Sequence, residues 1–248
     1  MTPIIRAYWA PKAAAEEREW EDAAAYDEAR GVAAVADGAS SSYRAGRWSA
    51  LLVEEFLKRP PQLSPDLSEF HRWVATVAEG FQTSSEAVSD TSWYASDASR
   101  RGSFATFVGT FLLSGVGGTR FIGVQLGDAC LFHTRGEQLV SALPTRDAEG
   151  FDSTPSLLSS SPYEESYGAE AARYCEGDLR PGDCLYLTTD AFGSAMLALA
   201  EAEQPIWTAA ADFGPNRFTR IVDELRAVEV LEDDDVTLVR IQLQESQS

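Results

Sequence analysis

The sequence predicts a single α+β domain of mostly antiparallel sheets over residues 1–248. The chain has 248 residues, 44% of them hydrophobic, which is enough for one substantial core. Strand-like segments fold back at short turns such as 135–137, as antiparallel hairpins do. Strands and helices come in blocks and do not alternate strictly, which argues against a parallel βαβ sheet.

The N-terminal third is predicted to hold strands followed by two helices. Residues 3–10 alternate well enough for a first strand. The Ala-rich run 13–25 favours a helix by propensity alone, but it contains an acidic pair and leads directly into a strand. That strand is the apolar run 32–38, which ends in an Asp-Gly pair typical of a turn. Apolar residues at helical spacing then predict amphipathic helices over 46–58 and 66–88.

The middle of the chain is predicted to form more strands and then a long loop. Strand-like runs over 103–115, 119–128 and 129–143, the last with its own hairpin turn, predict an antiparallel meander. Residues 144–167 are polar and rich in Ser and Pro. We expect this stretch to be a loop or flap over the domain and not a linker between domains.

The C-terminal third is predicted to contain two strands and two helices. A strand ends at Asp190 and a helix follows it directly. A second helix is expected over 214–229. The acidic turn 232–235 then precedes a strong final strand.

The charge and hydropathy of the chain exclude several classes of partner. The 39 Asp and Glu outnumber the 20 Lys and Arg, which gives a net charge of −19. No basic run of the kind that tracks phosphate backbones is present, so we expect neither a nucleic acid nor an anionic membrane as partner. No apolar run of about twenty residues and no signal-peptide pattern is found, and the expected location is therefore the cytoplasm.

The cysteines and histidines do not suggest a catalytic or metal centre. Cys130, Cys175 and Cys184 form no CxxC pair and are odd in number, so we expect reduced thiols. His71 and His133 are the only histidines, and each is expected to be an ordinary structural or surface residue.

Carboxylates recur at the ends of predicted strands. Asp37, Asp128 and Asp190 each follow an apolar strand, and the run 233–235 directly precedes one. Each one alone is best explained as a turn or N-cap residue. Taken together, carboxylates that converge at strand ends would repel one another unless divalent cations lie between them. Oxygen-rich ligand sets of this kind suit Mg²⁺ or Mn²⁺.

Four segments, in order, resemble the successive motifs of the PP2C-type (PPM) metal-dependent protein phosphatases, and of their bacterial branch in particular. They are WEDAAAYDEARGVAAVADGASSS, SFATFVGTFLLSGVGGTRFIGVQLGDACLF, PGDCLYLTTDAF and DDDVTLVRI. Each motif is weak alone, but four in family order over nearly the whole chain are fairly specific. The resemblance implies a four-layer αββα sandwich, in which helices flank two mainly antiparallel sheets.

The resemblance also implies a two-metal site of Mn²⁺ or Mg²⁺. Asp37 would bridge the two ions and the carbonyl of Gly38 would bind one of them, while Asp190 and Asp234 would hold the other. Asp37, Asp190 and Asp234 would thus be the catalytic residues. Asp128 would help to hold a third, weaker cation.

The acidic pair Glu21 and Asp22 would act through metal-bound water, which makes the stretch before them the approach to a strand. The implied reaction is attack by a metal-bridging hydroxide on phosphoserine or phosphothreonine in a protein. The implied partners are a phosphorylated protein and a cognate serine/threonine kinase.

The sequence departs from the family pattern at the arginine that binds the substrate phosphate. The family position, four residues before the acidic pair, is Glu17, and Arg18 follows it. Arg18 is our candidate for this role, although a strand that slips by one residue reverses the direction of its side chains. Arg6, Arg44 and Arg47 are alternatives.

Three further positions differ from the family pattern. Ala191 stands where a glycine usually follows the second Asp, Asp235 replaces the usual Asn, and Ala39 replaces the His of some animal members. An active metal-dependent phosphatase is the favoured hypothesis. The alternative is a non-catalytic relative that keeps the fold and binds a phosphoprotein or partner domain.

Overall fold

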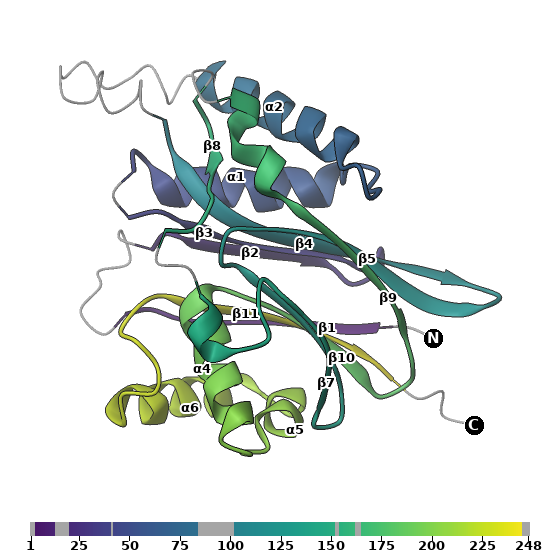
Figure 1. Ribbon diagram of the computed structural model, residues 1–248, viewed down its shortest axis with the longest axis vertical. Helices are drawn as coiled ribbons and strands as arrows, with labels where there is room; N and C mark the ends of the chain where they lie inside the picture. The colour runs from purple at the N-terminus through teal and green to yellow at the C-terminus, as the bar shows by residue number, and fades with distance from the viewer. Residues whose placement is uncertain are drawn as a thin grey trace.

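Two antiparallel β-sheets face each other, and helices cover the outer side of each (Figure 1). The computed structural model describes residues 3–12, 20–40, 42–83, 102–151, 154–161 and 165–244. The α+β class and the sandwich of two antiparallel sheets are as predicted. Within the described residues, no helix is long and apolar enough to cross a bilayer.

The five-stranded sheet has the order β1-β11-β10-β6-β7. All of its neighbouring strands pair antiparallel. Its strands are β1 (Pro3–Ala10), β11 (Val236–Leu243), β10 (Asp183–Thr188), β6 (Cys130–Arg135) and β7 (Gln138–Leu143).

The six-stranded sheet has the order β2-β3-β4-β5-β9, and the short β8 pairs with β4. The segment predicted as a loop or flap therefore contributes one strand to this sheet. Its described residues also include the 3-10 turn Ala148–Gly150 and the start of another, Glu165–Ala171. The strands are β2 (Asp22–Asp27), β3 (Val32–Gly38), β4 (Phe104–Gly115), β5 (Gly118–Leu126), β8 (Leu158–Ser159) and β9 (Arg173–Leu179).

Among the described residues, helices α1 and α2 cover the outer face of the six-stranded sheet, and α4, α5 and α6 cover that of the five-stranded one (Figure 1). The first two match the predicted amphipathic helices, although part of the second prediction lies beyond residue 83, outside the described residues. The short α5 was not predicted. The bounds are α1 (Ala45–Lys58), α2 (Ser68–Thr83), α4 (Asp190–Glu201), α5 (Ile206–Ala211) and α6 (Pro215–Ala227).

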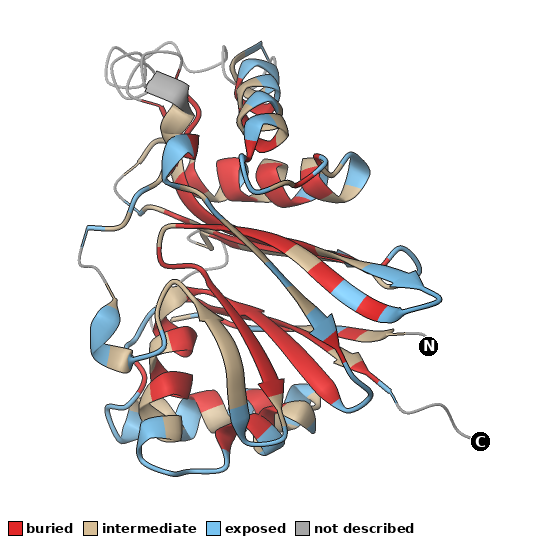
Figure 2. Cartoon of the chain, turned by 45° about the vertical axis from the view of Figure 1, so that its right-hand side comes forward, coloured by how far each residue is buried: buried red, intermediate tan, exposed pale blue. Residues whose placement is uncertain are grey.

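The buried residues form three clusters, one under each helical layer and one between the sheets (Figure 2). Successive side chains of β3 point to opposite faces of the sheet, so this one strand contributes residues to two of the clusters. Ala34 and Ala36 pack toward α1 and α2, whereas Ala33 and Val35 pack between the sheets. The next residue of the inward-facing set is Asp37, at the end of the strand.

The predicted four-strand meander is wrong. β4 and β5 pair in one sheet, and β6 and β7 pair in the other. The chain changes sheets at Gly127, whose φ of +78° only glycine adopts readily. A Cβ there would lie 2.6 Å from Thr106 Cγ2. The neighbour of β5 is instead β9, a strand that the sequence did not indicate.

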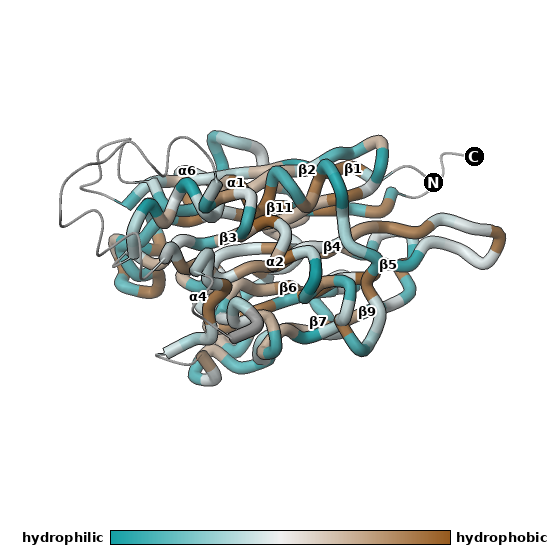
Figure 3. Tube along the Cα trace, turned by 90° about the horizontal axis from the view of Figure 1, so that it is seen from above, coloured by the Kyte–Doolittle hydropathy of each residue, from teal (hydrophilic) through white to brown (hydrophobic). Residues whose placement is uncertain are grey.

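The β4–β5 hairpin projects beyond the rest of the sandwich, with an apolar tip (Figure 3). Val116 at the turn is fully exposed and Leu113 is 44% exposed. The hairpin points away from the end of the sandwich where β3 leads into α1, so it plays no part in the site described next.

Candidate active site

Asp22 and Asp37 lie directly opposite each other on β2 and β3. Residues opposed in this way on an antiparallel pair have Cβ atoms about 5 Å apart, and like charges there repel. Both side chains fall on the face that packs between the sheets, because Ala24 and Val35, two residues away on each strand, pack there. The pair therefore places two carboxylates at one end of the gap between the sheets.

Asp128 and Asp190 reach the same end of the sandwich from the other sheet. Thr188 of β10 pairs with Cys130 of β6. Asp190 lies two residues beyond this pair on one chain segment and Asp128 two residues beyond it on the other. The charges of both carboxylates act on Asp37, so the four side chains share one electrostatic environment.

Burial and mutual repulsion make this cluster electrostatically unfavourable when it is fully ionised. Burial, followed by the charge of Asp235, raises the pKa of Asp22 from 3.8 to about 7. Burial, followed by the charges of Asp22, Asp190 and Asp128, raises the pKa of Asp37 well above its ordinary range. Without cations, Asp22 and Asp37 hold protons at pH values where an exposed Asp is ionised.

The start of α4 orients Asp190. The helix begins at this residue, and the Ala191 amide donates to Asp190 Oδ1 at 2.7 Å. Burial raises the pKa of Asp190. The bond from the Ala191 amide lowers it, but the charges of Asp234 and Glu232 raise it again, so the net shift is upward. The strand prediction was two residues too long, because β10 ends at Thr188.

Asp234 and Asp235 occupy very different environments. Asp234 is exposed, and the Asp235 amide donates to its Oδ1 at 2.8 Å. Asp235 is only 5% exposed and its carboxylate accepts from the backbone amides of Lys12 (3.0 Å) and Glu21 (3.3 Å). Asp235 therefore fixes the end of β1 and the start of β2, a positioning role that the sequence analysis missed.

Glu21 lies at the entrance to β2 and is tied to the turn after β3. Its carbonyl accepts from the Gly38 amide at 3.2 Å, and its carboxylate accepts from the Ser40 hydroxyl. A Cβ on Gly38 would lie 2.7 Å from the Ala45 carbonyl carbon, so this glycine lets α1 approach the site closely. The predicted acidic pair is thus at the site, with Asp22 buried and Glu21 at the rim.

The donor set fits hard divalent cations. It consists of oxygen ligands, and Asp22 Oδ2 is buried without a hydrogen-bond partner among the described residues. The side chains do not form a ready coordination site. The described residues contain no group of three or more His, Cys, Asp or Glu already placed to hold a metal. The unfavourable burial of several carboxylates at one point is what bound cations would relieve.

Of the candidate phosphate-binding arginines, Arg18 and the neighbouring Glu17 lie outside the described residues. Arg6 is ruled out by its position. It pairs with Arg240, four strand residues from Ala10 and the site, and it binds Glu28 at 2.9 Å. At about 3.4 Å per residue that is roughly 14 Å along the strand.

Arg44 and Arg47 lie much closer to the carboxylates. Arg44 directly precedes α1 and its guanidinium stacks on the Tyr43 ring, with 5.1 Å from the Cζ atom to the ring centroid. Arg47 is in the first turn of the same helix, whose start abuts Gly38. Both arginines remain candidates to contact a phosphate at the site.

Ala191 fits the site without strain. It lies in the first turn of α4, is 8% exposed and has no positive φ. The close approach that requires a glycine is two residues further on. A Cβ on Gly193 would lie 2.4 Å from Cys130 Sγ.

Cys130 borders the site, where its thiol donates to the Asp128 carbonyl at 3.1 Å, whereas His133 belongs to a separate network. His133 is buried, and its Nε2 lies 2.9 Å from Asp183 Oδ2. Asp183 also accepts two bonds of 2.8 Å from Arg135, so this is a structural network. All three cysteines are free thiols, as predicted.

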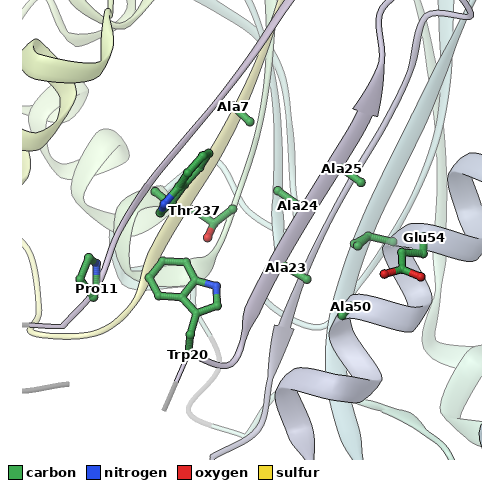
Figure 4. Close-up of a pocket in the computed structure, with 11 residues that line it drawn as sticks. Ala7, Pro11, Trp20, Ala23, Ala24, Ala25, Ala50, Glu54 and Thr237 are labelled. Atoms are coloured by element: carbon green, nitrogen blue, oxygen red, sulfur yellow. The ribbon is translucent and has the colours of Figure 1, made fainter. Parts of the chain in front are cut away.

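One cavity has none of the site's aspartates among its described lining residues. It has a volume of about 920 Å³ and lies between the edge strands β1 and β2, lined mainly by alanines, Trp9 and Trp20 (Figure 4). A smaller polar cavity of about 240 Å³ adjoins Asp128 on the other side of the site. The chemistry suggested by the charged groups belongs to the carboxylate end, because Glu54 is the only carboxylate among the described residues that line the larger cavity.

Comparisons with known proteins agree on one family. A family model described as protein phosphatase 2C matches residues 14–234. Stp1 from Staphylococcus aureus has a similar structure (TM-score 0.65, 12% identity, 99% of this chain and 96% of that chain). So do the Mycobacterium tuberculosis phosphatase PstP/Ppp (0.61, 16%, 99% and 100%) and the catalytic domain of PstP with two manganese ions (0.59, 17%, 98% and 99%). These identities show a shared fold; no curated protein sequence matches the chain.

Proposed function

Because the chain belongs to the protein phosphatase 2C family, we propose that Asp37, Asp190 and Asp234 hold the divalent cations on which its activity depends. The chain is a metal-dependent phosphatase that hydrolyses phosphoserine and phosphothreonine in proteins. One observation supports the assignment of residues above all others. Carboxylates from both sheets meet at one end of the sandwich, where burial and repulsion raise the pKa values of Asp22, Asp37 and Asp190.

Each carboxylate has a distinct proposed task. Asp37 and the Gly38 carbonyl would hold Mn²⁺ or Mg²⁺. Asp190 and Asp234 would hold a second ion. Asp128 would support a third, weaker cation.

Glu21 and Asp22 would act on the bound cations through intervening water. Asp235 keeps Glu21 in place through the 3.3 Å bond from its amide.

Bound divalent cations supply a water activated near neutral pH and neutralise charge on the phosphoryl oxygens. The chain's own residues exclude water from part of the site and orient its carboxylates. The buried alanines of β3 exclude water behind Asp37, and α4 fixes the orientation of Asp190. The reaction requires no covalent nucleophile, and none of the free cysteines is needed as one.

The substrate phosphate is expected to meet an arginine. Arg18 keeps this role as the residue nearest to the family position, and Arg44 and Arg47 are the alternatives beside the site. The proposed substrates are phosphoproteins of the cytoplasm, phosphorylated by a cognate serine/threonine kinase. Replacing each arginine with Ala would separate the three, because loss of the phosphate contact raises KM for every phosphopeptide.

Hydrolysis of a phosphothreonine peptide tests the proposal. Phosphate release is measured with Mn²⁺ and with EDTA for the wild type, Asp190→Asn and the control Asp178→Asn, an exposed carboxylate on β9. Activity that requires Mn²⁺ and Asp190, but not Asp178, is expected. A folded wild type that is inactive under every condition would favour the non-catalytic alternative. The regular helical setting of Ala191 removes one of the two reasons for that alternative.

A further inference from the structure

A polar cavity of about 240 Å³ shares one wall with the proposed metal site. Asp128 and Gly127 form this wall, at the point where the chain passes from β5 to the other sheet. Pro144 and Ser156, from the segment after β7, close the opposite side, and Arg173 of β9 lies at the rim. The volume is below the range of pockets that hold whole small ligands, and it suits one side chain.

Arg173 is held in place at this cavity by one side-chain hydrogen bond to the part of the chain that the structure describes. It is the first residue of β9 and pairs in register with the buried Gln125, which also lines the cavity. Its Nη1 donates to the Pro144 carbonyl at 2.9 Å. A guanidinium has five N–H donors, so this contact fixes the group and leaves donors for a ligand. No described carboxylate lies within 4.0 Å of its nitrogens.

The charges of the cavity would favour an anion when Asp128 holds a cation. Among the described residues that line it, only Asp128 and Arg173 are charged. A cation held by Asp128 would offset the carboxylate and leave Arg173 as the uncompensated charge. Arginine binds carboxylates and phosphates in a planar, two-pronged geometry, which makes it a selective partner for such groups.

We propose that this cavity binds an acidic side chain of the substrate protein, a carboxylate or a second phosphate, close in sequence to the phosphorylated residue. Arg173 is then a residue that determines specificity. The inference rests on the proposed function, because the shared wall at Asp128 is what brings the cavity beside the reacting phosphate. It adds a preference that the metal site alone does not give.

The test compares phosphothreonine peptides that carry Ala, Glu, phosphoserine or Lys at each position from −3 to +3. The wild type, Arg173→Gln, Arg173→Lys and Arg173→Glu are assayed with Mn²⁺. The matched control is Arg120→Gln, an exposed arginine on β5 that pairs with Leu113 near the far end of the hairpin. Arms with Glu and with phosphoserine separate the two sources of negative charge.

We expect the wild type to prefer an acidic residue at one position by about tenfold in kcat/KM, the scale of one charge-assisted hydrogen bond. The preference should lie in KM, disappear in Arg173→Gln, return in part in Arg173→Lys and shift toward Lys in Arg173→Glu. Arg120→Gln should keep the wild-type preference.

Equal preference in the wild type and Arg173→Gln would overturn the inference, as would a wild type without any preference. Peptide binding is followed in parallel by fluorescence anisotropy, so the cavity is tested even in an inactive protein. Absence of all turnover counts against the proposed function. Equal binding of acidic and neutral peptides by the wild type and Arg173→Gln counts against the cavity.

Discussion

Replacing Asp22 by Asn should stabilise the metal-free protein at neutral and alkaline pH. The folded protein keeps the proton of Asp22 up to about pH 7, whereas an unfolded chain releases it near 3.8. The contribution of this group to stability is therefore most favourable below pH 4 and is lost as the pH rises through 7. A rise from 3.8 to about 7 corresponds to about 4 kcal/mol above pH 7, at 1.36 kcal/mol per pH unit.

Asn has the shape of Asp without its charge, so Asp22→Asn removes this cost and also the repulsion felt by Asp37. In a domain of this size about 4 kcal/mol shifts the Tm by about 10 °C. The assay is thermal unfolding in chelator at pH 5 and pH 8, with Asp178→Asn as the control for a lost surface charge. The Tm difference between Asp22→Asn and the wild type should grow from pH 5 to pH 8.

Mn²⁺ should stabilise the wild type more than it stabilises Asp22→Asn. Cations bind the ionised carboxylates, so the wild type should gain more Tm from Mn²⁺ than Asp22→Asn does. An Asp22→Asn protein that is no more stable than the wild type at pH 8 in chelator would refute the electrostatic reasoning. Asp178→Asn should follow the wild type throughout.

Three other changes probe separate parts of the structure. Asp37→Asn should lower kcat by about 10²–10³-fold in Mn²⁺, the scale of losing one preorganised electrostatic group; phosphopeptide turnover within threefold of the wild type would contradict this. Gly193→Ala should cost about 1–3 kcal/mol of unfolding free energy, because its Cβ would lie 2.4 Å from Cys130 Sγ; urea unfolding should show recovery when Cys130→Ala is added, and no recovery would disprove the clash. Asp183→Asn should cost about 2–3 kcal/mol by loss of its charged bonds. Burial raises the pKa of Asp183, but bonds from Arg135 and other donors lower it by more, so the net pKa is below 3.8. The cost of Asp183→Asn should therefore shrink as the pH falls below 3.8. The substitution should leave Mn²⁺ binding unchanged.

Strand periodicity was sufficient to place Asp37 and Asp190 at or just beyond the ends of buried strands. The apolar run that ends at Asp37 and the one that leads to Asp190 are buried strands, and local alternation determines which face each residue takes. The pairing of Asp22 with Asp37 depends on the register of β2, which the helical propensity of the preceding Ala-rich run concealed. Here the family resemblance, and not the local pattern, indicated a strand.

Long-range partners were not predictable from local patterns. The sequence shows that Gly127 permits a sharp turn, but it does not show that the chain crosses there to the other sheet. The burial of Asp235 was not predictable for the same reason. Three consecutive aspartates look alike in sequence, and only the backbone amides of Lys12 and Glu21, more than 200 residues away, distinguish the one that is buried.

Titration of Mn²⁺ into the metal-free protein by isothermal calorimetry, for the wild type and Asp37→Asn, tests the central claim most directly. The claim is that carboxylates from both sheets jointly hold divalent cations at one end of the sandwich. The account predicts at least two equivalents of Mn²⁺ bound by the wild type at pH 7.5, with release of protons, and loss of this binding in Asp37→Asn. Absence of Mn²⁺ binding in the wild type, or equal binding by the two proteins, would contradict it.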